Sequence, residues 1–136
     1  MRKIRFRGKI KYTQRWIDGY LWQGCNEAYY IKTEEKGEFG SDLKDFEVFP
    51  ETVGQYWRTV NDVDLYDGDI FTIEGKYSKI VRYKEDKACF CVANLNQLEC
   101  EDVFDIWQIP DEKWWNERNI LIDVIGNEFD NPELLK

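Results

Sequence analysis

Short extended segments between closely spaced turn signals are the feature that most limits the fold of this chain. Residues 67–95 contain three runs of high β-propensity, Asp69–Ile73, Tyr77–Tyr83 and Ala88–Leu95. The turn signals around them are Asp67-Gly68, Glu74-Gly75 and Glu85-Asp86-Lys87. This regular spacing predicts an antiparallel meander of the kind found in small barrels and sandwiches.

The rest of the chain adds further strands. Residues 3–10 alternate basic and apolar side chains, which predicts a half-buried strand that Gly8 breaks or bulges. Asp18-Gly19 reads as a turn, residues 33–45 as a mobile polar loop, and residues 120–125 as a strand that ends at Gly126-Asn127. The best helix candidate lies near residues 111–118, after Pro110.

These elements predict an all-β or β-dominated fold, as a small bent barrel or a two-sheet sandwich with one short helix. The chain has 136 residues, which suits a single domain over residues 1–136. Such a chain can bury enough apolar surface to fold without a metal or a disulfide.

The chain contains no histidine, which excludes catalytic pairs and metal sites that depend on imidazole. The closest cysteine pair, Cys89-x-Cys91, lacks the spacing of a zinc knuckle, so we interpret it as two reduced thiols on one face of a strand. Asp67 and Asp69 fit a turn better than a cation site, and Glu128 and Asp130 fit a solvated loop better than an acid/base pair. We therefore expect no cofactor, no metal and no enzymatic activity.

The charge is unevenly distributed along the chain. The net charge is −8, yet residues 1–15 hold seven basic side chains and no acidic one. Four of the basic residues are candidate nucleic-acid contacts: Arg5, Arg7, Lys9 and Lys11. Their period-two spacing favours one shared face, unless a bulge at Gly8 shifts Lys9 and Lys11 out of register. The alternative is that this basic segment only pairs with acidic neighbours in the fold.

Six tryptophans are many for this length, and Trp114 and Trp115 are adjacent. On a helix the two side chains point about 100° apart, so both need not face the core. We take Trp114 and Trp115 as candidate protein contacts, because tryptophan is enriched in binding hot spots. The alternative is that this segment docks on the chain's own sheet.

Four segments, in this order, carry a family resemblance. They are Ile4–Lys9, Thr52–Tyr56, Leu65–Ile70 and Val124–Leu135, and the last contains the IGN…NPELL motif. In these segments the chain resembles the YopX family of bacteriophage and prophage proteins. The resemblance implies a mainly β fold and suggests homo-oligomers, and it implies no activity. One departure is the glycine-free link at residues 57–64, where the family carries a Gly- and Lys-rich hairpin.

The function that these observations favour is non-catalytic. We expect a phage or prophage accessory protein that binds a host protein or assembles with itself. A weak association with nucleic acid through the basic segment is the alternative. No apolar run is long enough for a signal peptide or a membrane span, so we expect a cytoplasmic protein and no membrane partner.

Overall fold

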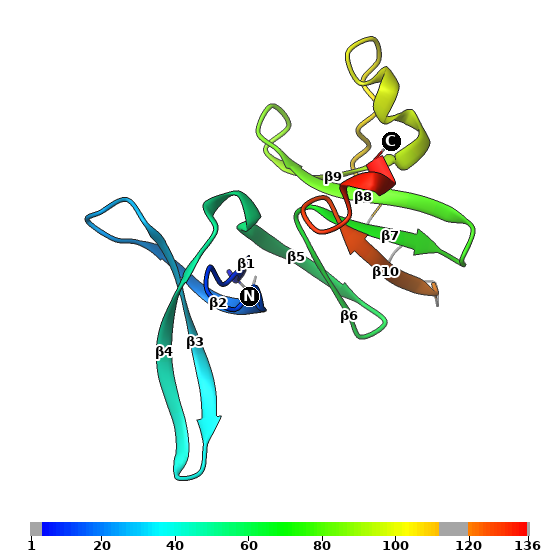
Figure 1. Ribbon diagram of the computed structural model, residues 1–136. Helices are drawn as coiled ribbons and strands as arrows, with labels where there is room; N and C mark the ends of the chain where they lie inside the picture. Colours follow the sequence, from blue (N-terminus) through cyan, green and yellow to red (C-terminus); the bar gives the residue numbers. More distant parts are fainter. Residues whose placement is uncertain (1–3, 112–119, 136) are drawn as a thin grey trace. The chain divides into compact units, whose positions relative to one another are not determined.

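The computed structural model describes residues 4–111 and 120–135 and is mainly antiparallel β-sheet (Figure 1). Its internal contacts divide the chain into two compact units, Met1–Tyr56 (unit 1) and Trp57–Lys136 (unit 2). The all-β prediction is therefore confirmed. The prediction of one domain over residues 1–136 stays a prediction.

The strands in the described residues are β1 (Phe6–Lys9), β2 (Trp16–Gln23), β3 (Tyr29–Gly37), β4 (Gly40–Val48), β5 (Gly54–Val60), β6 (Val63–Tyr66), β7 (Asp69–Ile73), β8 (Tyr77–Lys84), β9 (Cys89–Asn94) and β10 (Ile122–Asn127). Three 3-10 helices are described as well: η1 (Pro50–Thr52), η2 (Leu95–Cys100) and η3 (Pro132–Leu135). The strands form one sheet in the order β4-β3-β2-β1-β5-β6 and another in the order β10-β7-β8-β9.

Unit 1 is a curled sheet around a small core. The chain just after β1 meets the end of β4 through an antiparallel bridge between Ile10 and Val48. Both side chains are buried together with Ile31 from β3. Gly8 faces this core, because a Cβ there would lie 3.0 Å from Ile31 Cδ1 and from Val48 Cβ. The sheet can curl this tightly only because residue 8 has no side chain.

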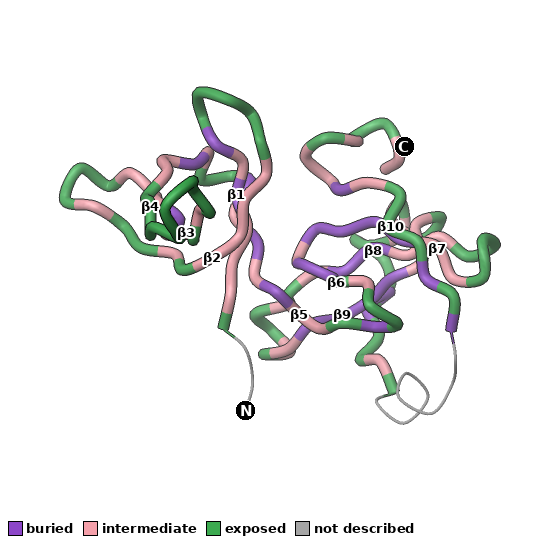
Figure 2. The backbone as a smooth tube through the Cα atoms, turned by 90° about the horizontal axis from the view of Figure 1, so that it is seen from below, coloured by how far each residue is buried: buried purple, intermediate pink, exposed green. Residues whose placement is uncertain are grey.

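The predicted mobile loop at residues 33–45 is wrong, since these residues belong to the long hairpin of β3 and β4. Nine residue pairs join the two strands, from Tyr29 opposite Val48 to Gly37 opposite Gly40. Most of β4 is exposed, so neither face needed apolar side chains and no alternating pattern marked the strand (Figure 2). Among the described residues, the far side of β4 is bonded only near its end, where Lys11 N donates to Glu47 O and Phe49 N donates to Lys9 O.

The predicted turn at Asp18-Gly19 is also wrong, because both residues lie inside β2. A Cβ on Gly19 would lie 2.1 Å from the carbonyl oxygen of Lys32 on β3. The glycine therefore permits a close approach of two backbones, which is the other common reason for glycine within a strand.

Unit 2 contains the predicted meander, which β7, β8 and β9 confirm. Both faces of this four-stranded sheet are covered. One face buries Phe71, Val81 and Phe90 against Val60 of β5 and Leu65 of β6. The other face has a buried cluster formed by Ile70, Ile80, Cys91, Ala93, Ile106 and Trp107, with residues of η2 and η3 packed on it. Most of the buried backbone in Figure 2 accordingly lies in unit 2.

The glycine-free link at residues 57–64 forms the tight hairpin of β5 and β6. Asn61 and Asp62 occupy its turn with positive φ angles of 48° and 67°. Asn and Asp tolerate this conformation better than other non-glycine residues, so the turn forms without glycine.

The structure also tests the predicted strand end at Gly126-Asn127 and the predicted state of the cysteines. β10 runs through Gly126 to Asn127, so the strand continues past the predicted stop. All four cysteines are free thiols, and Cys25 is exposed while Cys91 is buried. The helix predicted at residues 111–118 lies, apart from Asp111, outside the described residues. In the described parts of the chain, no helix is long and apolar enough to cross a membrane.

Candidate interaction face

The four candidate basic residues lie together on the outer face of unit 1. β1 pairs with β2 without a register shift, from Phe6 opposite Gly19 to Lys9 opposite Trp16. The bulge expected at Gly8 is therefore wrong, and Arg7 and Lys9 share the face opposite the core. Arg5 lies just before β1, and Lys11 lies in the turn that follows buried Ile10. Their side chains reach this face through ion pairs with Asp18 and Glu47.

Aromatic rings from neighbouring strands lie under these cations. The Arg7 guanidinium carbon lies 4.9 Å from the centre of the Trp16 ring, and Lys9 Nζ lies 6.0 Å from the same ring. Arg5 is placed likewise over Tyr56, at 4.7 Å. Each exposed contact of this type contributes about 0.5–1 kcal/mol and holds a long side chain against the sheet.

Carboxylates also pair with the basic segment. Arg5 Nε lies 3.0 Å from Asp18 on β2. Lys11 Nζ lies 2.7 Å from Glu47 on β4, and this hydrogen bond raises the pKa of Lys11. The structure thus places acidic partners beside the basic segment, which favours pairing within the fold over a free binding arm.

A second group of ion pairs links the hairpin of β3 and β4 to Arg15, which lies just before β2. Glu35 accepts a hydrogen bond from Arg15 at 2.9 Å and lies 3.3 Å from Lys44 Nζ. The hydrogen bonds from Arg15 and Lys44 lower the pKa of Glu35. The pairs are exposed, so each adds little stability in water.

Aromatic residues continue the same face along β2 and β3. Trp22 stacks on Tyr30 with ring centres 4.4 Å apart, and its indole nitrogen donates to Asp45 at 2.8 Å. Tyr20, two residues before Trp22, is 70% exposed, and Leu43 on β4 is 66% exposed. The sequence could have predicted this row of aromatic side chains, because positions 16, 20 and 22 alternate as on one face of a strand. The turn predicted at Asp18-Gly19 divided that strand and prevented the prediction. We define the outer face of unit 1 as Arg5, Arg7, Lys9, Lys11, Trp16, Asp18, Tyr20, Trp22, Tyr30, Lys32, Leu43, Asp45, Glu47 and Tyr56.

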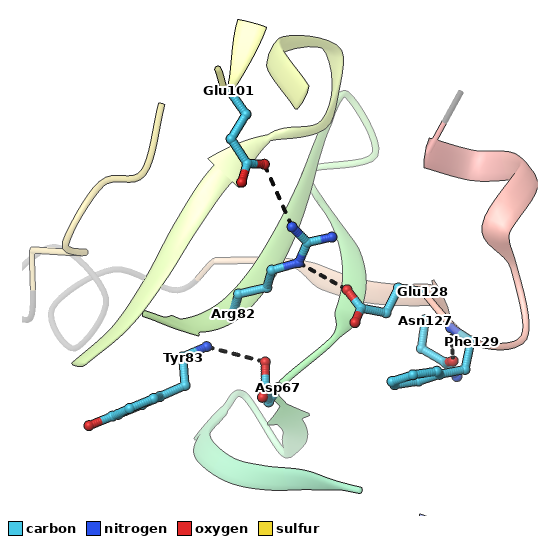
Figure 3. Close-up of polar contacts among 7 residues, drawn as sticks. All are labelled: Asp67, Arg82, Tyr83, Glu101, Asn127, Glu128 and Phe129. Atoms are coloured by element: carbon cyan, nitrogen blue, oxygen red, sulfur yellow. Dashed lines mark hydrogen bonds and ion pairs between the residues drawn. The ribbon is translucent and has the colours of Figure 1, made fainter. Parts of the chain in front are cut away.

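The motifs of unit 2 meet in a separate corner (Figure 3). Glu128 N donates to Gly68 O at 3.0 Å, and the Glu128 carboxylate accepts from Arg82 Nε at 3.0 Å. Asp67 accepts from the backbone of Tyr83 at 3.2 Å. The turn after β6 and the loop after β10 are thereby bonded to each other and to β8.

The remaining polar groups of this corner also organise the backbone. Asn127 Oδ1 accepts from the amides of Phe129 and Asp130 at 3.0 and 2.9 Å. Asp69 is buried and accepts from Tyr66 N at 2.8 Å. Within the described residues, no cluster of three or more side chains could hold a metal ion. The contacts of the corner therefore have a structural explanation that needs no ligand.

The other two candidate residues, Trp114 and Trp115, lie outside the described residues. Their proposed role as protein contacts stays a prediction.

Comparison with known protein families identifies a match over most of the chain. A family model described as YopX protein matches residues 5–136, which is nearly the whole chain and includes both units. No curated protein and no solved structure matches the chain.

Proposed function

Because the chain belongs to the YopX family, we propose that it is a phage or prophage accessory protein that binds other proteins and performs no chemistry. The proposed interaction surface is the outer face of unit 1. Its partner is a protein of the bacterial host or a further copy of the chain, in the host cytoplasm.

The observation that carries this proposal is the group of exposed apolar side chains on that face. Tyr20 and Leu43 are both at least 66% exposed, and Trp22 is 42% exposed although it stacks on Tyr30. In the described part of unit 1, the buried apolar side chains are those of Ile10, Ile31, Val48 and Tyr56, which is few for its size. Clusters of Trp, Tyr and Arg are typical of the energetic centre of a protein interface.

The experiment compares two exposed tyrosines. Tyr20→Ser alters the outer face, and Tyr77→Ser alters an equally exposed ring on β8 in unit 2. We expect Tyr20→Ser to reduce either the solution mass measured by light scattering or the capture of a host protein. Tyr77→Ser should retain both. A wild-type chain that stays monomeric at all concentrations and captures nothing would refute the proposal.

A second function, weak binding of nucleic acid, has one specific observation in its favour. Arg5, Arg7 and Lys9 share a face with the partly exposed ring of Trp16, and cations beside an aromatic ring suit a single-stranded backbone and its bases. A mobility shift with single- and double-stranded probes at about 50 mM salt tests it, with Arg7→Gln as the variant. The absence of any shift eliminates this function without affecting the first.

A further inference from the structure

Two free thiols on β9 lie close enough to share one metal ion. The Sγ atoms of Cys89 and Cys91 are 3.9 Å apart, because residues two positions apart on a strand face the same side. Both side chains belong to the cluster covered by η2 and η3, where Cys91 is buried and Cys89 is partly exposed. We propose that Cys89 and Cys91 form a two-coordinate site for a soft monovalent cation, Cu(I).

The spacing of the sulfurs fits a bridging ion better than a disulfide. A disulfide needs the sulfurs at about 2.05 Å, and it needs the two Cα atoms within about 6.8 Å. Residues i and i+2 of a strand already span about 6.6–6.8 Å, so the bond would strain β9. With metal–sulfur bonds of about 2.3 Å, a linear S–M–S unit needs the sulfurs about 4.6 Å apart. Cys89 and Cys91 reach that separation if their sulfurs move apart by less than about 1 Å.

Two basic residues of the adjacent strand lie beside the pair of cysteines. Two thiolates and one Cu(I) carry a net charge of −1. Arg82 lies directly opposite Cys91 on β8, and Lys84 lies opposite Cys89, so two cations face the pair from the adjacent strand. Lys84 Nζ also lies 5.0 Å from the centre of the Trp107 ring, which packs on the same cluster. Burial raises the pKa of the Cys91 thiol, so the ion has to displace its proton. A soft ion can do so because thiolates are its preferred ligands.

The binding step is a simple exchange. Each thiol releases its proton to the buffer, and two S–Cu bonds form. The ion arrives as Cu(I) and stays Cu(I), so no electron is transferred. Cys89, the more exposed of the two thiols, offers the point of entry.

The test is a competition between the full reduced chain and a chromogenic Cu(I) chelator under anaerobic conditions. We expect the wild type to retain one equivalent of Cu(I), with two sulfurs in its coordination shell by X-ray absorption. The affinity should fall at least about tenfold in Cys89→Ser, because even the loss of a supporting residue has an effect of that size. Cys25→Ser, which alters the exposed thiol in unit 1, should bind as the wild type does.

Two further variants make the assignment specific. Cys91→Ser should also lose binding, but Cys89→Ser carries the test because Cys91 is buried and its replacement can disturb the fold. Cys100→Ser alters the other thiol beside this cluster and should retain the ion. The proposal is overturned if the wild type yields its copper as readily as Cys89→Ser, or if Cys100→Ser loses it to the same extent.

Discussion

The amide of Glu128 donates to the carbonyl oxygen of Gly68 at 3.0 Å, which joins the loop after β10 to the turn before β7. These residues are 60 positions apart in the sequence and belong to two of the segments that resemble the YopX family. The bond therefore gives these two distant motifs a shared structural role, because it holds the loop after β10 against the turn before β7.

Gly68→Ala should destabilise unit 2 more than Gly75→Ala. Gly68 has a φ of +92°, outside the left-handed region that other residues tolerate, and its Cβ would contact Glu128 Cγ at 3.4 Å. Gly75 has a φ of +68° and open space around it. We expect Gly75→Ala to cost about 1 kcal/mol and Gly68→Ala to cost more, within the range of about 1–3 kcal/mol for strained backbone. Urea unfolding measures both, and equal losses would contradict the interpretation.

Gly19→Ala should disrupt the pairing of β2 with β3. The added methyl would meet the Lys32 carbonyl oxygen at 2.1 Å, and a backbone atom cannot rotate away. The expected loss is about 1–3 kcal/mol, with amide shifts in NMR spectra centred on these two strands. Gly37→Ala is the control, since its nearest neighbour would be Gly40 O at an ordinary 3.5 Å. A spectrum of Gly19→Ala that overlays on the wild type would show that the strands are not in this register.

Phe71→Ala should cost about 3–5 kcal/mol, because this fully buried ring fills the core between the meander and the hairpin of β5 and β6. Phe39→Ala makes the same chemical change at a ring that is 97% exposed. Thermal unfolding should shift strongly for the first variant and hardly at all for the second. A similar shift in both would place Phe71 outside the core.

Acid should weaken the ion pairs of Glu35. Its folded-state pKa lies below the ordinary value of 4.5, chiefly because Arg15 and Lys44 donate hydrogen bonds to it. A lowered folded pKa means that the carboxylate stabilises the fold above pH 4.5 and loses this effect as the pH falls through the folded pKa. The stability difference between wild type and Glu35→Gln should therefore shrink as the pH falls below 4.5. An NMR titration of the Glu35 carboxyl that gave a midpoint above 4.5 would reverse the sign.

The thiols should differ in their reactivity. Burial, and then the hydrogen bond with Cys89, raises the pKa of Cys91 to about 11. Alkylation of the native chain at about pH 8 should modify exposed Cys25 first and Cys91 last, because the thiolate is the reactive form. Mass mapping over time gives the order. Early labelling of Cys91 would show that η2 and η3 do not cover it.

Elements with local signals could be predicted from the sequence. The turns before β7, before β8 and before β9 carry Asp-Gly, Glu-Gly and an acidic cluster, and the runs between them are rich in β-formers. The hairpin of β3 and β4 could not be predicted in this way, because exposure on both faces removes the alternating apolar pattern. Gly19 was predicted as a turn residue, although its role is to let β2 approach the Lys32 carbonyl oxygen closely. That role becomes visible only when the pairing of β2 with β3 is known.

Part of the candidate interaction face could be predicted from the sequence, and part could not. Period-two spacing placed Arg7 and Lys9 on one face, which the register of β1 confirms. Their pairing with Asp18, Trp16 and Tyr56 depends on which strands are neighbours, and the sequence does not encode that order in any local pattern.

The outer edge of β4 also affects how the protein behaves at high concentration. A long exposed strand edge is the usual starting point for amyloid-like stacking. Here Asp42, Lys44 and Asp45 follow one another with only Leu43 between them. When a second copy of this strand pairs in the register that sets like charges opposite each other, those charges repel it. The charged segment that hid β4 from prediction therefore also disfavours aggregation through this edge.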